Sequence, residues 1–423
     1  MNILLLGGGG REHAFAYKLA QDPGCSRLYI APGNAGTAEC GTNVALSVTD
    51  FPGIKAFVLD EGIRMVIVGP EEPLVRGIVD FFQQDPSLNG VIVIGPTAAG
   101  ARLEGSKAFA KKFMKRHGIP TARYREVNDP GEGAAFLKTL APPYVLKADG
   151  LAAGKGVLIL NTLDEAVETL HHMLAGQFGD ASRRVVVEEF LSGIEFSVFV
   201  LTDGKSYRIL PEAKDYKRVG EGDSGPNTGG MGAVSPVPFV DGELWQKVEA
   251  RIIRPTVAGL ASEHIDYKGF IFFGLIRVKG DPYVIEYNCR MGDPETEVVL
   301  PRLKNRLVEL FTHLASGTLA EVRLETLPGV AATVMLTAGG YPGDYRKGDV
   351  LRIGARRQGS LYLHAGTKQA GDQVLTNGGR VMAITSFGTS VSEAVAGSLE
   401  AAGQVHFEGK YYRRDIGKDL EQG

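Results

Sequence analysis

The chain has 423 residues, of which 44% are hydrophobic and 22% are charged, and its formal net charge is -3. This length exceeds what one hydrophobic core accommodates, so we expect about three domains. The composition is that of a soluble globular enzyme, and a charge so close to neutral provides no overall attraction to nucleic acid or to an anionic membrane.

The spacing of the cysteines and the first residues of the chain indicate the cellular compartment. Cys25, Cys40 and Cys289 form no C-x-x-C pair, which argues against a disulfide framework or a zinc site. The apolar run Ile3–Leu6 is too short for a signal sequence or a membrane span. We therefore expect a cytoplasmic protein with neither nucleic-acid nor membrane partners.

Short apolar runs alternate with helical patterns over the first hundred residues, which predicts an open parallel α/β sheet. Ligands bind such sheets beyond the carboxyl ends of the strands. The expected strands are 3–6, 28–30, 65–68 and 91–94, and the expected helices are 11–20, 51–60 and 74–82.

The loop Gly7–Gly10 follows the first strand and resembles a dinucleotide-binding turn. The third glycine of that fingerprint is replaced by Glu12, and the second strand ends in Ala31–Asn34 rather than in an acid. Nicotinamide or flavin binding is therefore disfavoured. The loop still offers backbone N–H groups and Arg11 to an anion. The alternative is a tight turn without a ligand.

From Ser106 a basic helix leads into a small α+β unit, whose strand 144–147 ends in Lys147. The loop 147–157 lacks the spacing and the hydroxyl of a Walker A motif, so we interpret it as a glycine hairpin that closes over phosphates. An ammonium at the end of an apolar strand is costly to bury without an anion. The alternative is a flexible surface hairpin.

The apolar strand 184–189 ends in acids and an apolar pair, a composition that suits an adenine slot with Glu195 at the ribose. Surface acids that cap a strand are the alternative. Further on come a long polar loop at 214–232 and a helix interrupted by Pro255. The chain after about residue 328 consists of strands and turns with one late helix near 390–401.

A strand at 284–288 places Glu286 and Asn288 on one face, because side chains alternate along a strand. A carboxylate and an amide oxygen are ligands that Mg²⁺ prefers. Arg290 follows them and can grip a phosphoryl or carboxylate group with two donors. These residues favour phosphoryl transfer from a nucleotide, and the alternative is an edge strand with a solvated polar face.

In chain order, a lysine before a helix, a lysine entering a glycine hairpin, an E-E-F-L segment and a late E-x-N strand resemble the ATP-grasp superfamily. The similarity is closest to the phosphoribosylamine–glycine ligase (glycinamide ribonucleotide synthetase) family and covers essentially the whole chain. Its most specific motifs are G-P-N-T-G-G-M-G-A (225–233) and E-Y-N-C-R-M-G-D-P-E-T (286–296). The others include G-G-R-E-H-A (9–14), V-G-P-E (68–71), L-E-G-S-K (103–107), K-A-D-G-L-A-A-G-K-G-V (147–157) and T-N-G-G-R-V (376–381).

The resemblance implies that ATP drives the joining of glycine to 5-phosphoribosylamine through a glycyl-phosphate intermediate, as in purine biosynthesis. It implies Mg²⁺, with Mn²⁺ as an alternative, and a monomer or weak dimer. It also implies an N-terminal α/β domain (1–104), an ATP-grasp central domain (105–120 and 190–327), a small mobile lid (121–189) and a mostly β C-terminal domain (328–423).

The resemblance also assigns roles to residues of this chain. Glu286 and Asn288 bind the metal. The strand at 270–278 carries no acid, whereas many ATP-grasp enzymes have a further ligand there, so fewer protein ligands are expected. The catalytic residues are Arg290, Asp293 and Asp215. The residues that contact ATP are Lys107, Lys147, Gly150, Gly154, Lys155, Gly156, Glu188, Glu189, Phe190, Leu191 and Glu195. The residues that contact the other substrates are Gly9, Arg11, Asn34, Asn227, Thr228, Gly229, Gly230 and Met231.

Three other functions compete with this interpretation. A related ligase could activate bicarbonate instead of glycine, and the acid that triggers ATP consumption would distinguish the two. A nucleotide-binding regulator would not need metal ligands and an arginine in one cluster. A dehydrogenase would need the glycine fingerprint that is broken here.

Overall fold

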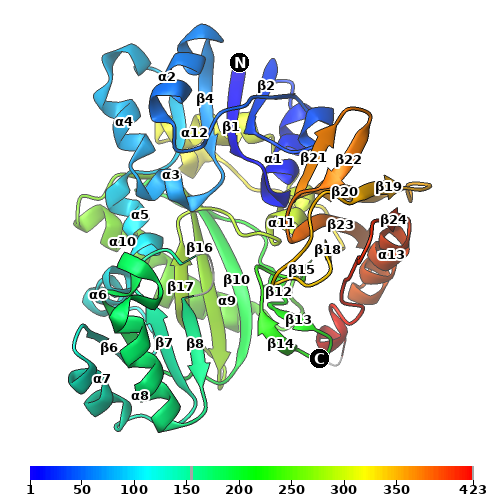
Figure 1. Ribbon diagram of the computed structural model, residues 1–423. Helices are drawn as coiled ribbons and strands as arrows, with labels where there is room; N and C mark the ends of the chain where they lie inside the picture. Colours follow the sequence, from blue (N-terminus) through cyan, green and yellow to red (C-terminus); the bar gives the residue numbers. More distant parts are fainter. Residues whose placement is uncertain (153–155, 422–423) are drawn as a thin grey trace.

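A parallel sheet with helices on its faces forms the N-terminal part of the computed structural model (Figure 1), which describes residues 1–152 and 156–421. The predicted open parallel sheet is confirmed, with strand order β5-β4-β1-β2-β3. The predicted helix at 74–82 is wrong, because Gly77 adopts a left-handed φ of 84° and divides it in two. The elements are β1 (Asn2–Gly7), α1 (Gly10–Ala20), β2 (Arg27–Pro32), β3 (Thr42–Asn43), α2 (Phe51–Asp60), β4 (Ile63–Val68), α3 (Glu71–Val75), α4 (Ile78–Gln84), β5 (Ile92–Pro96) and α5 (Ala98–Gly105).

The same sheet continues into the central part of the chain, because β5 pairs with a long antiparallel strand. Pro96 and Gly95 of β5 lie opposite Tyr267 and Lys268. The long strand is almost continuously apolar and buried, as expected for a strand covered on both faces. The added strands are β10 (Ile194–Thr202), β11 (Tyr207–Ile209), β16 (Tyr267–Val278) and β17 (Asp281–Asn288), and the nine strands form one hydrogen-bonded sheet.

A separate four-stranded antiparallel sheet carries the predicted glycine hairpin between β7 and β8. Two helices cover it and bury Leu137, Leu146 and Leu170 in a core of their own. The helix α6 (Lys107–Arg116) packs beside its strand β9. The other elements are β6 (Tyr124–Val127), α7 (Pro130–Leu137), β7 (Tyr144–Ala148), β8 (Val157–Leu160), α8 (Leu163–His172), a π-helical turn (Met173–Gln177), a 3-10 turn (Gly179–Ser182) and β9 (Val185–Glu189).

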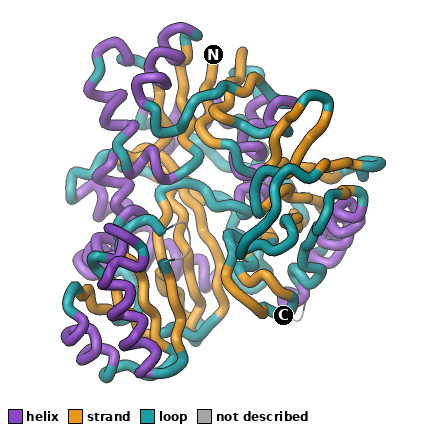
Figure 2. Tube along the Cα trace, in the orientation of Figure 1, coloured by secondary structure: helices purple, strands orange, loops and turns teal. Residues whose placement is uncertain are grey.

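The C-terminal part is mostly strand and loop with one long helix, as predicted (Figure 2). Its five-stranded sheet has the order β12-β15-β18-β23-β20. Two of these strands, β12 and β15, come from the beginning and the end of the polar loop, and β15 pairs with β18. The elements are β12 (Lys214–Asp215), β13 (Arg218–Gly220), β14 (Ser224–Asn227), β15 (Gly232–Ser235), β18 (Val330–Thr337), β19 (Val350–Ile353), β20 (Ser360–His364), β21 (Thr367–Ala370), β22 (Gln373–Thr376), β23 (Arg380–Gly388), α13 (Val391–Gly403) and β24 (Val405–His406).

The remaining helices lie between these sheets. Pro255 lies at the start of α10, which continues directly from α9 through a π-helical turn (Glu249–Ile253). The irregular turn thus lies next to the residue that has no backbone N–H to donate within the helix. Among the described residues, no helix combines the length and the apolar character that a membrane span requires. These helices are α9 (Gly242–Val248), α10 (Arg254–Ser262), α11 (Thr296–Arg302) and α12 (Leu307–Ser316).

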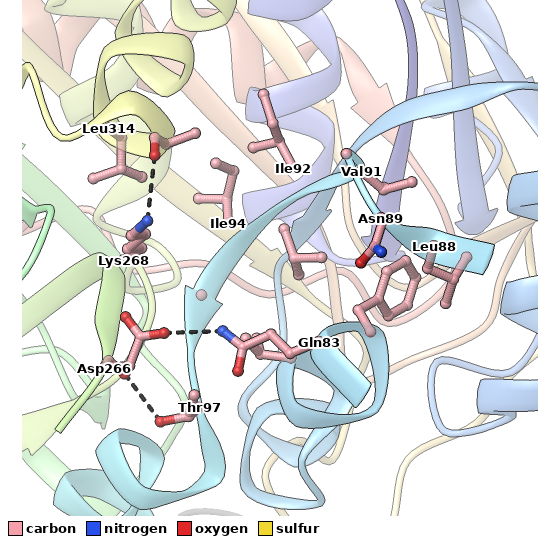
Figure 3. A pocket seen from close by; sticks show the side chains of 16 residues that line it. Gln83, Leu88, Asn89, Val91, Ile92, Ile94, Thr97, Asp266, Lys268 and Leu314 are labelled. Carbon is pink, nitrogen blue, oxygen red and sulfur yellow. Dashed lines mark hydrogen bonds between the residues drawn. The ribbon is translucent and has the colours of Figure 1, made fainter. Parts of the chain in front are cut away.

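A cavity of about 370 Å³ lies along the outer edge of β5 (Figure 3). Apolar side chains such as Ile92 and Leu314 line it. Lys268 donates to the carbonyl of Ala315 (3.2 Å) at its rim, and Gln83 donates to Asp266 (2.9 Å). None of the predicted site residues that the structure describes lines this cavity, so it is separate from the site below.

Candidate active site

The glycine loop after β1 lies against the turn that follows β17. The backbone N–H of Arg11 points to the Asp293 carboxylate (3.4 Å), and the Arg11 guanidinium donates to the carbonyl of Met291 (3.2 Å). A Cβ atom added at Gly9 would lie 3.1 Å from the same carboxylate. The predicted residues Gly9 and Arg11 therefore form one corner with Asp293, which lies more than 280 positions away in the chain.

Arg290 is held by two carboxylates that were not predicted as site residues. Its Nη2 donates to Glu104 (2.6 Å) and its Nε to Glu71 (3.3 Å). Glu104 also accepts the backbone N–H of Cys289 (2.8 Å). Burial lowers the pKa of Arg290, but the charges of Glu104 and Glu71 outweigh it and raise that pKa above its usual value. The guanidinium is thus charged and fixed in orientation.

Arg380, the first residue of β23, joins the C-terminal part to this corner. Its Nη1 lies 3.0 Å from Asp293 Oδ1 and donates to the carbonyls of Asp293 and Gly229 (2.7 Å each). Gly230 has a φ of 119° and lies so close to the Pro294 ring that a side chain there would collide with it. The predicted substrate loop is therefore packed against the Asp293 turn.

Lys217 gathers three predicted acids around one ammonium group. Its Nζ lies 2.8 Å from Glu195 Oε2 and 3.5 Å from Asp215 Oδ1. Burial lowers the pKa of Lys217, but the charges of Asp215, Glu195 and Glu286 raise it well above its usual range. Thr228 donates to the Lys217 carbonyl (2.8 Å), which ties the substrate loop to the same place. Sequence reasoning missed this lysine, although it lies two residues from Asp215.

Two buried lysines share the carboxylate of Glu188. Lys147 Nζ lies 3.1 Å and Lys111 Nζ 3.0 Å from its Oε2, and all three side chains are at most 5% exposed. The other oxygen, Oε1, is buried without a hydrogen-bond partner among the described residues. Burial lowers the pKa of Lys107, against the opposing charge of Glu286. Lys111 and Lys147 thus bring two buried ammonium groups to one carboxylate, an arrangement that suits a further anion.

The other predicted ATP contacts border this pocket. Phe190 is 39% exposed and Leu191 is half-buried, so both present apolar surface. Glu189 is engaged by Arg123, which donates through its backbone N–H (2.8 Å) and Nε (2.9 Å). Gly150 donates to the carbonyl of Ala181 (3.1 Å), and the Gly156 carbonyl accepts from Ala148 (2.8 Å). The predicted residues Gly154 and Lys155 lie outside the described residues.

The predicted metal ligands end β17. A bulge displaces Ile285, since Glu286 lies opposite Gly274 and Val284 opposite Leu275. Lys147 donates to the carbonyl of the bulged Ile285 (3.2 Å). Glu286 and Asn288 follow the bulge and stay on one face of the strand, so a carboxylate and an amide oxygen fit a divalent cation. No group of three His, Cys, Asp or Glu side chains in the described ranges is arranged to hold a metal ion, so the cation would complete its shell with other oxygens.

Two other predicted substrate residues use their side chains inside the protein. The Asn34 amide donates to the carbonyls of Gly8 (3.0 Å) and His364 (2.8 Å) and accepts from the Gly36 and Thr37 backbone. Met231 is fully buried. Their direct contact with a substrate stays a prediction. Asn227, by contrast, is exposed on the loop.

Two buried acids behind the Asp293 turn were not predicted. Glu295 and Glu297 are 3% and 0% exposed. Burial, reinforced by the charge of Asp215, raises the pKa of Glu295 to about 8. Burial and the charge of Asp293 raise the pKa of Glu297 well above its usual value. Both carboxyls therefore favour the protonated form in this low-dielectric corner.

Three family models match consecutive parts of this chain. The Phosphoribosylglycinamide synthetase N domain matches residues 1–104, its ATP-grasp (A) domain matches 105–296, and its C domain matches 331–419. A phosphoribosylamine–glycine ligase of Vibrio cholerae is 48% identical over 423 residues, covering 99% of this chain and 98% of that protein. A protein of the same name from Chlorobaculum tepidum is 46% identical over 425 residues, covering 99% of both.

Solved structures agree with this relationship. The crystal structure of a phosphoribosylamine–glycine ligase from Thermotoga maritima superposes with a TM-score of 0.85 at 38% identity, covering 98% of this chain and 100% of that one. The biotin carboxylase domain of the Hydrogenobacter thermophilus 2-oxoglutarate carboxylase gives 0.73 at 17% identity, covering 100% and 94%, which shows a shared fold alone. The chain belongs to the phosphoribosylglycinamide synthetase family.

Proposed function

We propose that this chain ligates glycine to 5-phosphoribosylamine at the expense of ATP, giving glycinamide ribonucleotide, ADP and phosphate. The proposal is carried by the meeting of three features in one place: the Arg290–Asp293 turn, the pocket of Lys107 and Lys147, and the pair Glu286 and Asn288 between them. Family membership supports the identity of the reaction.

In the first step an oxygen of the glycine carboxylate attacks the γ-phosphorus, and the bond from that phosphorus to the β–γ bridging oxygen breaks. Phosphoryl transfer needs positioning and charge stabilisation more than covalent chemistry. Arg290 is fixed by Glu104 and Glu71, so it supplies a pre-oriented charge to the reacting oxygens. Lys107 and Lys147 neutralise the phosphates from the other side.

In the second step the ribosylamine nitrogen attacks the acyl carbon of glycyl phosphate, phosphate leaves, and the nitrogen loses a proton. Arg380 contacts Gly229 and Asp293, and Lys217 contacts Thr228 and Asp215. These contacts hold the Asn227–Met231 loop beside the two acids. We assign Asp293 and Asp215 to positioning the amine-bearing substrates. Gly9 and Arg11 lie at the same corner, where the Gly9 N–H donates to Glu12 (2.7 Å) and the Arg11 guanidinium is bound by Glu12 (2.6 Å) and the Met291 carbonyl. We assign these two residues to shaping the corner that receives the ribose phosphate.

For adenosine we propose the edge formed by Glu188, Phe190, Leu191 and Glu195. The unpartnered, buried Oε1 of Glu188 is an acceptor for a donor on the ligand. Phe190 and Leu191 provide apolar cover, and Glu195 is exposed for ribose hydroxyls. The glycine hairpin, including Gly150 and Gly156, stands beside them as the cover over the phosphates.

For the metal we propose Mg²⁺ at Glu286 and Asn288, with Mn²⁺ as a substitute. When bound there, a divalent cation would neutralise charge on the phosphate oxygens. We further propose the domain limits given by the sequence, a monomer or weak dimer, and a cytoplasmic location.

The test is a phosphate-release assay with ATP and Mg²⁺, in which glycine, phosphoribosylamine and bicarbonate are supplied alone and in combination. We expect turnover only when glycine and phosphoribosylamine are both present. The shared fold with biotin carboxylase makes bicarbonate the informative competitor. Bicarbonate-dependent turnover, or ATP that survives every combination, would refute the proposal.

A further inference from the structure

The first turn of α6 is capped from another part of the chain by Asp149. The N–H of Lys107 donates to the Asp149 carbonyl (3.0 Å), and the N–H of Ala108 donates to Asp149 Oδ1 (2.8 Å). Ser106, the N-cap, donates its hydroxyl to the same Oδ1 (2.8 Å) and accepts from Phe109 (3.1 Å). The free N–H groups of this helix start are thereby filled, so a phosphate would meet the Lys107 side chain rather than the helix end.

The backbone and charge of Asp149 are fixed equally well on the other side. Its N–H donates to the carbonyl of Arg184 (3.2 Å), and its Oδ2 accepts from the Arg184 guanidinium (2.9 Å). The Asp149 side chain is 11% exposed. The residue therefore locks α6 to the four-stranded sheet at the point where β7 passes into the glycine hairpin.

The contacts of Asp149 also bring two lysine side chains close to each other. Lys107 begins α6 and Lys147 is the last residue but one of β7, and the charge of Lys147 opposes protonation of Lys107, whose pKa is lowered mainly by burial. Two ammonium groups of like charge repel each other, which disfavours holding them in one pocket. The hydrogen bonds of Asp149 to the first turn of α6 oppose that repulsion by tying the two elements together.

We propose that Asp149 is a positioning residue that fixes Lys107, Lys147 and the start of the glycine hairpin as one phosphate-binding unit. The inference rests on the proposed function and deepens it. It assigns to Asp149 no contact with ATP, and it makes the affinity for ATP, rather than for glycine, depend on a carboxylate outside the reacting groups.

The experiment compares Asp149→Ala with Asp129→Ala in the full-length chain. Asp129 is a matched control, because it caps α7 in the same sheet unit by accepting from Glu132 (2.8 Å), and it touches none of the proposed ATP residues. We expect KM for ATP to rise about tenfold or more in Asp149→Ala, with KM for glycine nearly unchanged. In Asp129→Ala we expect all kinetic constants to stay close to those of the original chain.

A milder variant covers the case in which Asp149→Ala does not fold. Asp149→Asn keeps an acceptor for Ser106 and Ala108 but removes the charge facing Arg184, so its KM for ATP should lie between the other two. Equal KM values for ATP in the Asp149 and Asp129 variants, or a rise shared equally by ATP and glycine, would overturn the inference. The unaltered chain is assayed alongside; if it shows no glycine-dependent turnover, the proposed function fails instead.

Discussion

Arg290 and Glu104 form a 2.6 Å ion pair although they lie 186 residues apart, and this pair sets the direction of the guanidinium. Glu104 binds the backbone N–H of the preceding Cys289 as well, so one carboxylate fixes both the side chain and the peptide that carries it. The arginine assigned to the transition state is thus oriented by an acid at the end of α5.

Replacing Glu104 with Gln should therefore lower kcat more than it changes KM for ATP. The amide keeps the shape but gives Arg290 a weaker partner, and a misplaced charge can cost about 100-fold in rate. Steady-state kinetics with glycine and ATP varied in turn measures this. A variant with unchanged kcat would show that the orientation of Arg290 does not limit the reaction.

Replacing Glu286 with Ala should abolish turnover while the fold remains intact, because Glu286 supplies the carboxylate of the proposed metal pair. Asp281→Ala is the matched control: it removes an acid at the other end of β17, where it pairs with exposed Arg251 (2.8 Å). Phosphate release across a Mg²⁺ series, with circular dichroism of both variants, tests the point. Full activity in Glu286→Ala would place the metal elsewhere.

Replacing Arg380 with Lys should raise KM for glycine or phosphoribosylamine by about tenfold and leave KM for ATP nearly unchanged. The lysine side chain is shorter, so its ammonium would lie farther from Asp293 and Gly229 than Nη1 of Arg380 does, and hydrogen bonds to charged groups contribute about 1.5–3 kcal/mol. Arg346→Lys, in an exposed pair with Asp349, serves as the control. If KM for ATP rises instead, the Gly229 loop belongs to the nucleotide site.

Glu295 should make stability depend on pH. Its pKa is raised by burial to about 8 in the folded protein, against about 4.3 in an unfolded chain. The folded state thus binds the proton more tightly, and the associated stability is complete below pH 4 and is lost as pH rises to about 8. Relative to Glu295→Gln, the unaltered chain should lose stability between pH 5 and pH 8.5. Urea unfolding of both proteins at both pH values measures the difference between their free energies of unfolding. A difference that does not change with pH would contradict this prediction.

Local patterns in the sequence were sufficient for most elements and for Glu286 and Asn288. The bulge at Ile285 precedes both residues, so the side chains of β17 still alternate between the two faces of the sheet from Glu286 to Asn288. The spacing of apolar residues predicted one helix at 74–82, but the left-handed φ of Gly77 divides this segment into α3 and α4. A glycine inside a helical pattern was the available signal.

Contacts between distant segments were out of reach of sequence reasoning. Glu71 and Glu104 belong to two of the motifs that carry the family resemblance, yet their role depends on packing against Arg290. Lys217 follows β12 and Arg380 begins β23, and these two strands come together in the sheet order β12-β15-β18-β23, which no local pattern predicts. Asn34 organises its loop because the His364 carbonyl lies beside it. Burial of Glu295 and Glu297 likewise follows from tertiary structure and leaves no local signature.

The pairing of β15 with β18 has a consequence for how the protein is made. Strand β15 emerges from the ribosome about a hundred residues before its partner, and elongation proceeds at roughly 5–20 residues per second. For on the order of ten seconds the nascent chain holds an unsatisfied strand edge and an unanchored Asn227 segment. Synthesis must therefore be nearly complete before any ribosome-bound copy can acquire a working catalytic centre.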